Sequence, residues 1–172
     1  MFTFRAFACA VFALIVSAAA AYAHPTLTQR TAQADSYFRA SFSVPHGCDG
    51  AATTKVSIWL PESIVQARPM AKPGWQIEIQ RVKLEKELEG PHGHKITHRV
   101  AKVIFSGGSL SDDHFDEFTL SLRLPKEAGA LYFPVEQVCG EKVRAWNELP
   151  SPGQKLHDLE SPAAMLTVTP KQ

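Results

Sequence analysis

Apolar side chains recur at every second residue of this chain, and this spacing constrains the fold more than any other feature of the sequence. Alternation at period two places apolar side chains on one face of a strand, whereas a helix needs a period near 3.6. The sequence therefore predicts half-buried strands. The alternation is clearest at residues 38–44, 56–60, 75–79, 100–105, 118–124, 131–135 and 165–168.

Pro and Gly separate these strands and indicate turns. The turn-forming segments are residues 45–47, 73–74, 107–108 and 152–153. Residues 81–88 have helix-forming composition, but their alternation favours a strand that runs into a polar loop at residues 89–98. We expect an irregular tail at residues 149–162 and a last strand at residues 163–168. About seven short strands with turns between them predict an all-β fold, an immunoglobulin-like antiparallel β-sandwich.

Residues 1–23 have the features of a secretory signal peptide. Arg5 is followed by an apolar run at residues 6–16 and by the small-residue pattern Ala21-Tyr22-Ala23. This run is shorter than the ~20 apolar residues that span a bilayer, and it ends in a cleavage motif. We therefore expect cleavage after Ala23, export to the periplasm, no lipid insertion of the mature protein, and a single domain at residues 24–172.

Charge and cysteine content narrow the partners and the redox state. Loss of Arg5 lowers the formal net charge from +1 to zero, which argues against nucleic acid and anionic membranes as partners. Cys9 leaves with the signal peptide, so Cys48 and Cys139 remain in a compartment that permits disulfides. One intramolecular bridge between them is the simplest prediction.

His24 is the most informative residue for function. Signal cleavage would give it a free α-amine beside its imidazole, and two nitrogen donors on one residue suit Cu(II). Pro25 has no amide N–H, so it cannot supply a deprotonated backbone nitrogen as a further ligand. The alternative is that His24 is simply an exposed, frayed terminus.

His46, Cys48 and Asp49 form a second candidate group. A His-x-Cys pair could bind metal, but an oxidised Cys48 is withdrawn from ligation and leaves His46 and Asp49 as donors. The alternative is a disulfide-anchored turn. The two interpretations are compatible, because a bridge to Cys139 would hold the loop where His46 can reach a metal.

Three weaker signals have simpler explanations. His92, His94 and His98 form a histidine cluster that we interpret as a solvated loop or a low-affinity secondary metal site. The acidic run at residues 112–117 has no calcium-loop spacing, so we expect it to cap a turn and face solvent. Trp146 lies where a strand gives way to the tail, and it either covers a cation or closes one end of the sandwich.

Several segments, taken in their order along the chain, resemble the YcnI-like copper-binding domain family, in the form that has His-Gly-Cys and a second Cys. The resemblance implies an exported β-sandwich that binds Cu(II) through the amino-terminal His24, with Trp146 beside the ion. Where members of the family place a Glu after Val-Pro, this sequence has His46, so His46 is the expected third ligand and Asp49 the fallback. The segments are residues 24–26, 43–48, 53–56, 60–62, 72–75, 115–118 and 131–139.

The leading hypothesis is a monomeric periplasmic protein that sequesters copper or transfers it between donor and acceptor proteins of the cell envelope, without turnover. The competing hypothesis is a copper oxidase or monooxygenase in which His46 completes a histidine brace. A third is an envelope scaffold that binds no metal. Motifs for a serine nucleophile, a phosphate loop and a metalloprotease are absent from the sequence.

Overall fold

The computed structural model describes residues 24–90 and 93–172. The predicted signal peptide, Cys9 and His92 lie outside the described residues. The described chain is built almost entirely of strands, and η2 (Leu156–Asp158) is a single turn of 3-10 helix. No helix in this part of the chain is long and apolar enough to cross a bilayer.

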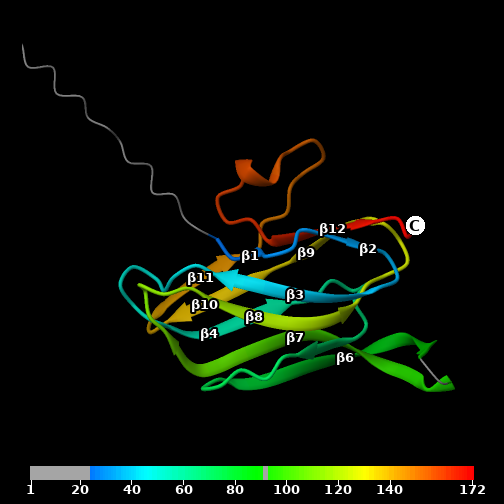
Figure 1. Cartoon of the computed structure of the whole chain (residues 1–172), viewed down its shortest axis with the longest axis horizontal. Coiled ribbons are helices and arrows are strands. Elements are labelled where there is room, and N and C mark those ends of the chain that lie inside the picture. Colours follow the sequence, from blue (N-terminus) through cyan, green and yellow to red (C-terminus); the bar gives the residue numbers. More distant parts are fainter. Residues whose placement is uncertain (1–23, 91–92) are drawn as a thin grey trace, which may run out of the picture.

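The described strands form three sheets (Figure 1). The four-stranded sheet has the order β1 (Thr26–Leu27), β3 (Tyr37–Val44), β8 (Asp116–Arg123) and β5 (Ala67–Pro69). The five-stranded sheet has the order β11 (Lys142–Trp146), β10 (Val135–Cys139), β4 (Thr53–Trp59), β7 (Lys95–Leu110) and β6 (Gln76–Glu89). The three-stranded sheet has the order β2 (Thr31–Gln33), β12 (Ala164–Thr169) and β9 (Gly129–Phe133).

All pairings between these strands are antiparallel except that of β2 with β12, which is parallel. The chain changes sheets at Pro134, between β9 and β10. Proline cannot donate to a sheet ladder, so a junction between strands suits it. Its carbonyl still accepts a 3.0 Å hydrogen bond from the Trp59 amide, which keeps β10 beside β4. The predicted all-β antiparallel sandwich is confirmed.

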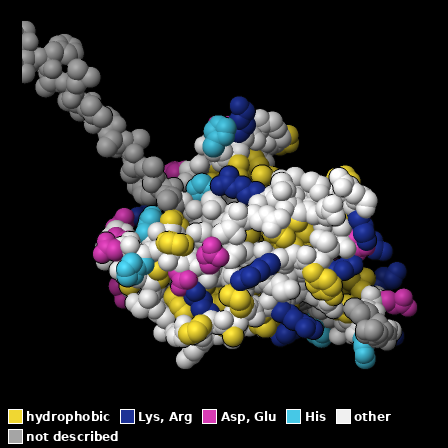
Figure 2. Space-filling view, in the orientation of Figure 1, with side chains coloured by type: hydrophobic (Ala, Val, Ile, Leu, Met, Phe, Trp, Pro, Cys, Tyr) yellow, Lys and Arg dark blue, Asp and Glu magenta, His cyan; other side chains and the backbone are white. Residues whose placement is uncertain are grey.

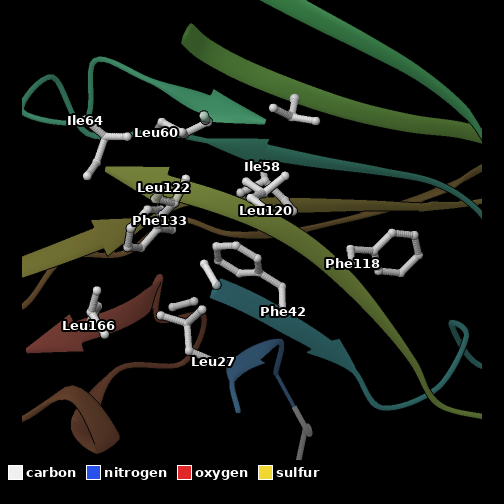
Figure 3. Close-up of a cluster of buried hydrophobic side chains, with 14 of the residues drawn as sticks. Leu27, Phe42, Ile58, Leu60, Ile64, Phe118, Leu120, Leu122, Phe133 and Leu166 are labelled. Carbon is white, nitrogen blue, oxygen red and sulfur yellow. The ribbon is translucent and has the colours of Figure 1, made fainter. Parts of the chain in front are cut away.

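The core lies between the sheets and contains the side chains that define the alternation (Figure 3). Phe105 of β7 contacts Phe118 of β8 edge to face at 5.1 Å, which joins the five-stranded and four-stranded sheets. Phe42 of β3 contacts Phe133 of β9 at 5.4 Å in the same manner. Aromatic pairs of this geometry stabilise a core beyond the area that they bury.

The structure differs from the prediction at two turns or loops. Residues 107–108 do not form a turn but lie inside β7, and a Cβ added to Gly108 would come within 2.1 Å of the Trp75 indole. Glycine at this position is needed for packing and not for reversing the chain. The predicted loop at residues 89–98 is shorter than expected, because β6 continues to Glu89 and β7 begins at Lys95.

Candidate metal centre

The loop that carries His46 follows β3 and closes in a tight turn at residues 48–51. The amides and carbonyls of Cys48 and Ala51 exchange hydrogen bonds of 2.8 and 3.1 Å. Asp49 and Gly50, the central residues, have φ values of 49° and 84°. Positive φ at both central positions is the type I′ conformation, for which Asp-Gly is a preferred sequence. The local sequence therefore dictates this turn.

Two buried contacts hold the loop to the five-stranded sheet. Cys48 and Cys139 form the predicted disulfide, with 5.8 Å between their Cα atoms. Gln137 of β10 donates from Nε2 to the carbonyl oxygen of His46 at 2.7 Å and to Thr53 Oγ1 at 2.5 Å. Because Gln137 and Thr53 are almost fully buried, these hydrogen bonds fix the backbone of His46 relative to the core.

The His46 loop, the end of β11 and the tail after it enclose a small pocket of about 100 Å³. Its volume suits an ion with a few waters. Four predicted site residues come together here. The pocket is lined by His46, Gly47, Cys48, Asp49, Arg144, Ala145, Trp146, Glu160 and Ser161.

The imidazole of His46 is half exposed, and its Nδ1 lies 2.7 Å from the Gly47 carbonyl oxygen. A carbonyl oxygen only accepts, so in this contact Nδ1 carries the proton. Asp112 Oδ1 lies 3.8 Å from the same nitrogen and adds negative charge beside it. This contact leaves Nε2 as the nitrogen that can coordinate a metal, and carbonyl and carboxylate partners orient metal-bound histidines in the same way.

Asp49, the fallback ligand, lies in the same pocket, but its carboxylate is already paired with two basic side chains. Arg144 Nη2 donates to Asp49 Oδ2 at 2.7 Å, and Lys142 Nζ lies 3.5 Å from that oxygen. The hydrogen bond from Arg144 is the largest cause that lowers the pKa of Asp49, and the charges of Arg144 and Lys142 lower it further. A metal ion would have to compete with both cations for this carboxylate.

Trp146 ends β11 and is 7% exposed, so its indole forms a wall of the pocket and not a surface feature. The tail returns past it, because the backbone of Glu148 exchanges hydrogen bonds with Ser161 and Ala163 at 3.0 Å. The same turn of the tail brings Glu160 into the pocket lining.

His24 does not line this pocket. It lines a neighbouring one of about 330 Å³, together with residues of β1, η2 and β12. Neighbouring residues of the tail line the two pockets, Glu160 and Ser161 the first and Ala163 the second. Pairing of Thr26 with Ser43 brings the start of β1 to the end of β3 that leads into the His46 loop. His24 and His46 therefore lie at the same end of the sandwich.

The weaker signals have mixed outcomes. His94 and His98 lie along the exposed hairpin of β6 and β7, away from the pocket lining. The acidic run begins with the predicted turn, closed by the hydrogen bond from the His114 amide to Ser111, but its carboxylates do not simply face solvent. Asp112 Oδ2 accepts from the Gly50 amide at 2.8 Å, and Asp116 binds Lys72 Nζ at 2.6 Å.

Sequence reasoning missed Gln137 and Asp112 as supports of the His46 loop. A glutamine at an inward position of a strand otherwise filled by Val135 and Cys139 was a usable signal for Gln137, since buried polar groups need partners. No comparable signal distinguished Asp112 from its acidic neighbours. Among residues 24–90 and 93–172, no three His, Cys, Asp or Glu side chains are grouped so as to hold a metal ion.

Histidine side chains gather at the end of the molecule that carries these pockets (Figure 2). Acidic side chains accompany them on the left of the view, and further histidine and basic side chains lie on the projecting tail at the top. This end therefore offers nitrogen and carboxylate donors close to solvent.

The model of a family described as "Domain of unknown function (DUF1775)" matches residues 24–168. A solved protein from Nocardia farcinica, whose title describes an uncharacterized protein with an immunoglobulin-like fold, is 25% identical to the chain. The likeness covers 84% of this chain and 97% of that one, with a TM-score of 0.64, and it confirms the immunoglobulin-like architecture. Comparison with curated proteins gave no match.

Proposed function

The chain belongs to the DUF1775 family, which includes YcnI-like domains, and from that premise we propose that it is an exported protein that binds Cu(II) as cargo. After cleavage at Ala23, the α-amine and imidazole of His24 would chelate the ion, and His46 Nε2 would supply a third nitrogen. Trp146 would cover the ion on one side. Copper is held and released here, and the protein performs no turnover.

The observation that carries the proposal is the convergence of three separate segments at one end of the sandwich. The β1–β3 pairing brings His24 there, the disulfide-anchored loop presents His46, and β11 supplies Trp146. Nitrogen donors of this kind select Cu(II) among common divalent ions. An ion held by so few protein ligands keeps open positions that an acceptor protein can enter.

His46 fits the role of third donor better than Asp49. The hydrogen bond of its Nδ1 to Gly47 leaves Nε2 available, whereas Asp49 is bound by Arg144 and Lys142. We therefore expect His46→Ala to weaken Cu(II) binding and Asp49→Asn to leave it nearly unchanged. The reverse result would make the carboxylate the ligand.

The decisive experiment moves the α-amine without changing any side chain. Protein that begins at His24 is compared with protein that carries one additional alanine before His24, and each is titrated with Cu(II) and weighed by native mass spectrometry. Tight binding of one Cu(II) by the first and its loss in the second is expected. Equal affinity in both would exclude the amino-terminal chelate.

A second measurement separates binding from catalysis. If the site serves an oxidase or monooxygenase, the copper-loaded protein consumes oxygen or peroxide when a reductant is supplied, and His24→Ala abolishes that consumption. We expect no such consumption.

A third measurement tests the scaffold hypothesis. If copper leaves the unfolding midpoint unchanged, the protein binds no metal in its folded state.

A further inference from the structure

The pocket that contains His24 also contains a histidine and a methionine from distant parts of the chain. His157 comes from η2 and Met165 from β12, and both line the same pocket of about 330 Å³ as His24. Two histidines and one methionine, from three segments far apart in the sequence, thus line one pocket. The function proposed above uses neither His157 nor Met165.

The chemistry of these donors differs from that of the His46 pocket. A thioether is a soft ligand, and soft ligands select Cu(I) over harder divalent ions. Imidazole and thioether ligands bring no negative charge to a site, so they suit a monovalent ion better than a divalent one. The rest of the lining is largely apolar, with Leu27, Leu156, Ala163 and Ala164.

The charges around the pocket discriminate between the two oxidation states. Arg30 lines the pocket and repels either copper ion, the divalent ion about twice as strongly as the monovalent one at the same distance. Asp158 lies next to the histidine, with its Oδ1 3.3 Å from His157 Nε2. This contact occupies Nε2 and leaves Nδ1 of His157 available as a ligand, in the way that carboxylate partners orient metal-bound histidines.

The backbone holds the pocket together without a metal. The Thr167 amide donates to the Arg30 carbonyl at 2.9 Å, and β12 continues from there in parallel pairing with β2. Met165 pairs with Tyr132 of β9 on the other side of β12, so its backbone position is fixed within the sheet. η2 is closed by the hydrogen bond from the Asp158 amide to the Lys155 carbonyl at 3.1 Å.

We propose that His24, His157 and Met165 form a Cu(I) site, which differs from the proposed Cu(II) site in using His157 and Met165 in place of His46 and Trp146. The site uses the imidazole of His24 and does not need its α-amine. Its use in copper transfer rests on the function proposed above, whereas the site itself does not. Because His24 is a ligand in both proposed sites, the protein could accept copper in either oxidation state at the same end of the sandwich.

The test measures Cu(I) affinity under anaerobic conditions, by competition with the chromophoric Cu(I) chelator bicinchoninate, using the protein that begins at His24. We expect His157→Ala and Met165→Leu each to lower Cu(I) affinity by at least about 10-fold. Matched controls are His98→Ala on β7 and Met70→Leu, whose side chains line neither pocket. X-ray absorption of the Cu(I) form should show a sulfur ligand that Met165→Leu removes.

The two proposals fail in distinguishable ways. Unchanged Cu(I) affinity in both His157→Ala and Met165→Leu would overturn the Cu(I) site, and retained Cu(II) affinity in those variants checks that they are folded. An additional alanine before His24 should remove Cu(II) binding and leave Cu(I) binding in place. Loss of Cu(I) binding in that extended protein would show that the α-amine is required and would overturn the side-chain site.

Discussion

The side-chain amide of Gln137 donates a 2.7 Å hydrogen bond to the carbonyl oxygen of His46, and it links a half-exposed candidate ligand to the buried interior of the sandwich. The same nitrogen lies 2.5 Å from Thr53 Oγ1. Because Gln137 itself is almost fully buried, a change there affects stability and ligand position together.

Replacing Gln137 by leucine should lower the free energy of unfolding by about 1–3 kcal/mol, since it leaves buried polar groups unpaired. The change also frees the backbone of His46, so Cu(II) affinity should fall. Chemical denaturation and copper titration measure the two effects. Gln80→Leu, at an exposed position of β6, is the control and should change neither quantity.

The disulfide should contribute a large part of the stability. Cys48 and Cys139 are separated by 91 positions, and a loop of that length restricts the unfolded chain by up to about 5 kcal/mol. The double variant Cys48→Ala/Cys139→Ala should therefore unfold at lower denaturant and lose Cu(II) affinity as the His46 loop loosens. Equal stability of the oxidised protein and the variant would contradict this prediction.

Asp112 should act on copper through His46. Replacing it by asparagine removes the negative charge near His46 Nδ1, and we expect Cu(II) affinity to fall by about 10-fold. Asp113→Asn is the matched control. The carboxylate of Asp113 is exposed, and it forms no ion pair with His46 of the kind that Asp112 forms. If both variants bind copper alike, Asp112 has no role beyond its hydrogen bond to Gly50.

Asp49 should make stability depend on pH in the acid range. Its pKa in the folded protein is lowered, mainly by the hydrogen bond from Arg144, so the ionised form is favoured by folding. The resulting stabilisation is present above the unfolded-state pKa of about 3.9 and is lost as pH falls through the lower folded-state value. Thermal unfolding of Asp49→Asn between about pH 5 and 2 should show a smaller loss than the unchanged protein.

Asp35 allows the acid dependence of stability to be compared with that of Asp49 at a position outside both pockets. Its pKa is lowered by hydrogen bonds from Lys171 and Arg123, so Asp35→Asn should flatten the same acid limb. Because Asp35 lines neither pocket, its replacement should leave copper binding unchanged. A copper effect of Asp35→Asn would indicate a global change in the fold.

Period-two alternation predicted the long strands because one face of each strand is buried, as the phenylalanines of β3, β7 and β8 show. It did not predict β1, β2 or β5, since two or three residues are too few to establish a period. Their positions follow from pairing with longer strands. The turn predicted at Gly107-Gly108 was wrong for a related reason. Glycine is needed at position 108 because the Trp75 indole, which is remote in the sequence, packs against it.

The candidate site was predictable only in part. The cysteine count predicted the disulfide, and the donor chemistry of His46 and Asp49 selected their loop. The sequence contained no information on which donor is free, because that depends on Arg144 and Lys142, which lie more than 90 residues away in the chain. The assignment of His24 to a different pocket from His46 likewise depends on the tail, whose residues line both pockets.

Because β1 is only two residues long, the start of the described chain should have a low free energy of local opening. β1 pairs with β3 through two residues at the edge of its sheet, and such short edge elements open at low free energy without unfolding the rest. An ion shared by His24 and His46 would bind the closed form more tightly than the open one and would suppress this opening by mass action. Amide exchange of β1 would then report copper occupancy, and the uncovered edge of β3 would give a partner protein a physical means of distinguishing the empty form from the loaded one.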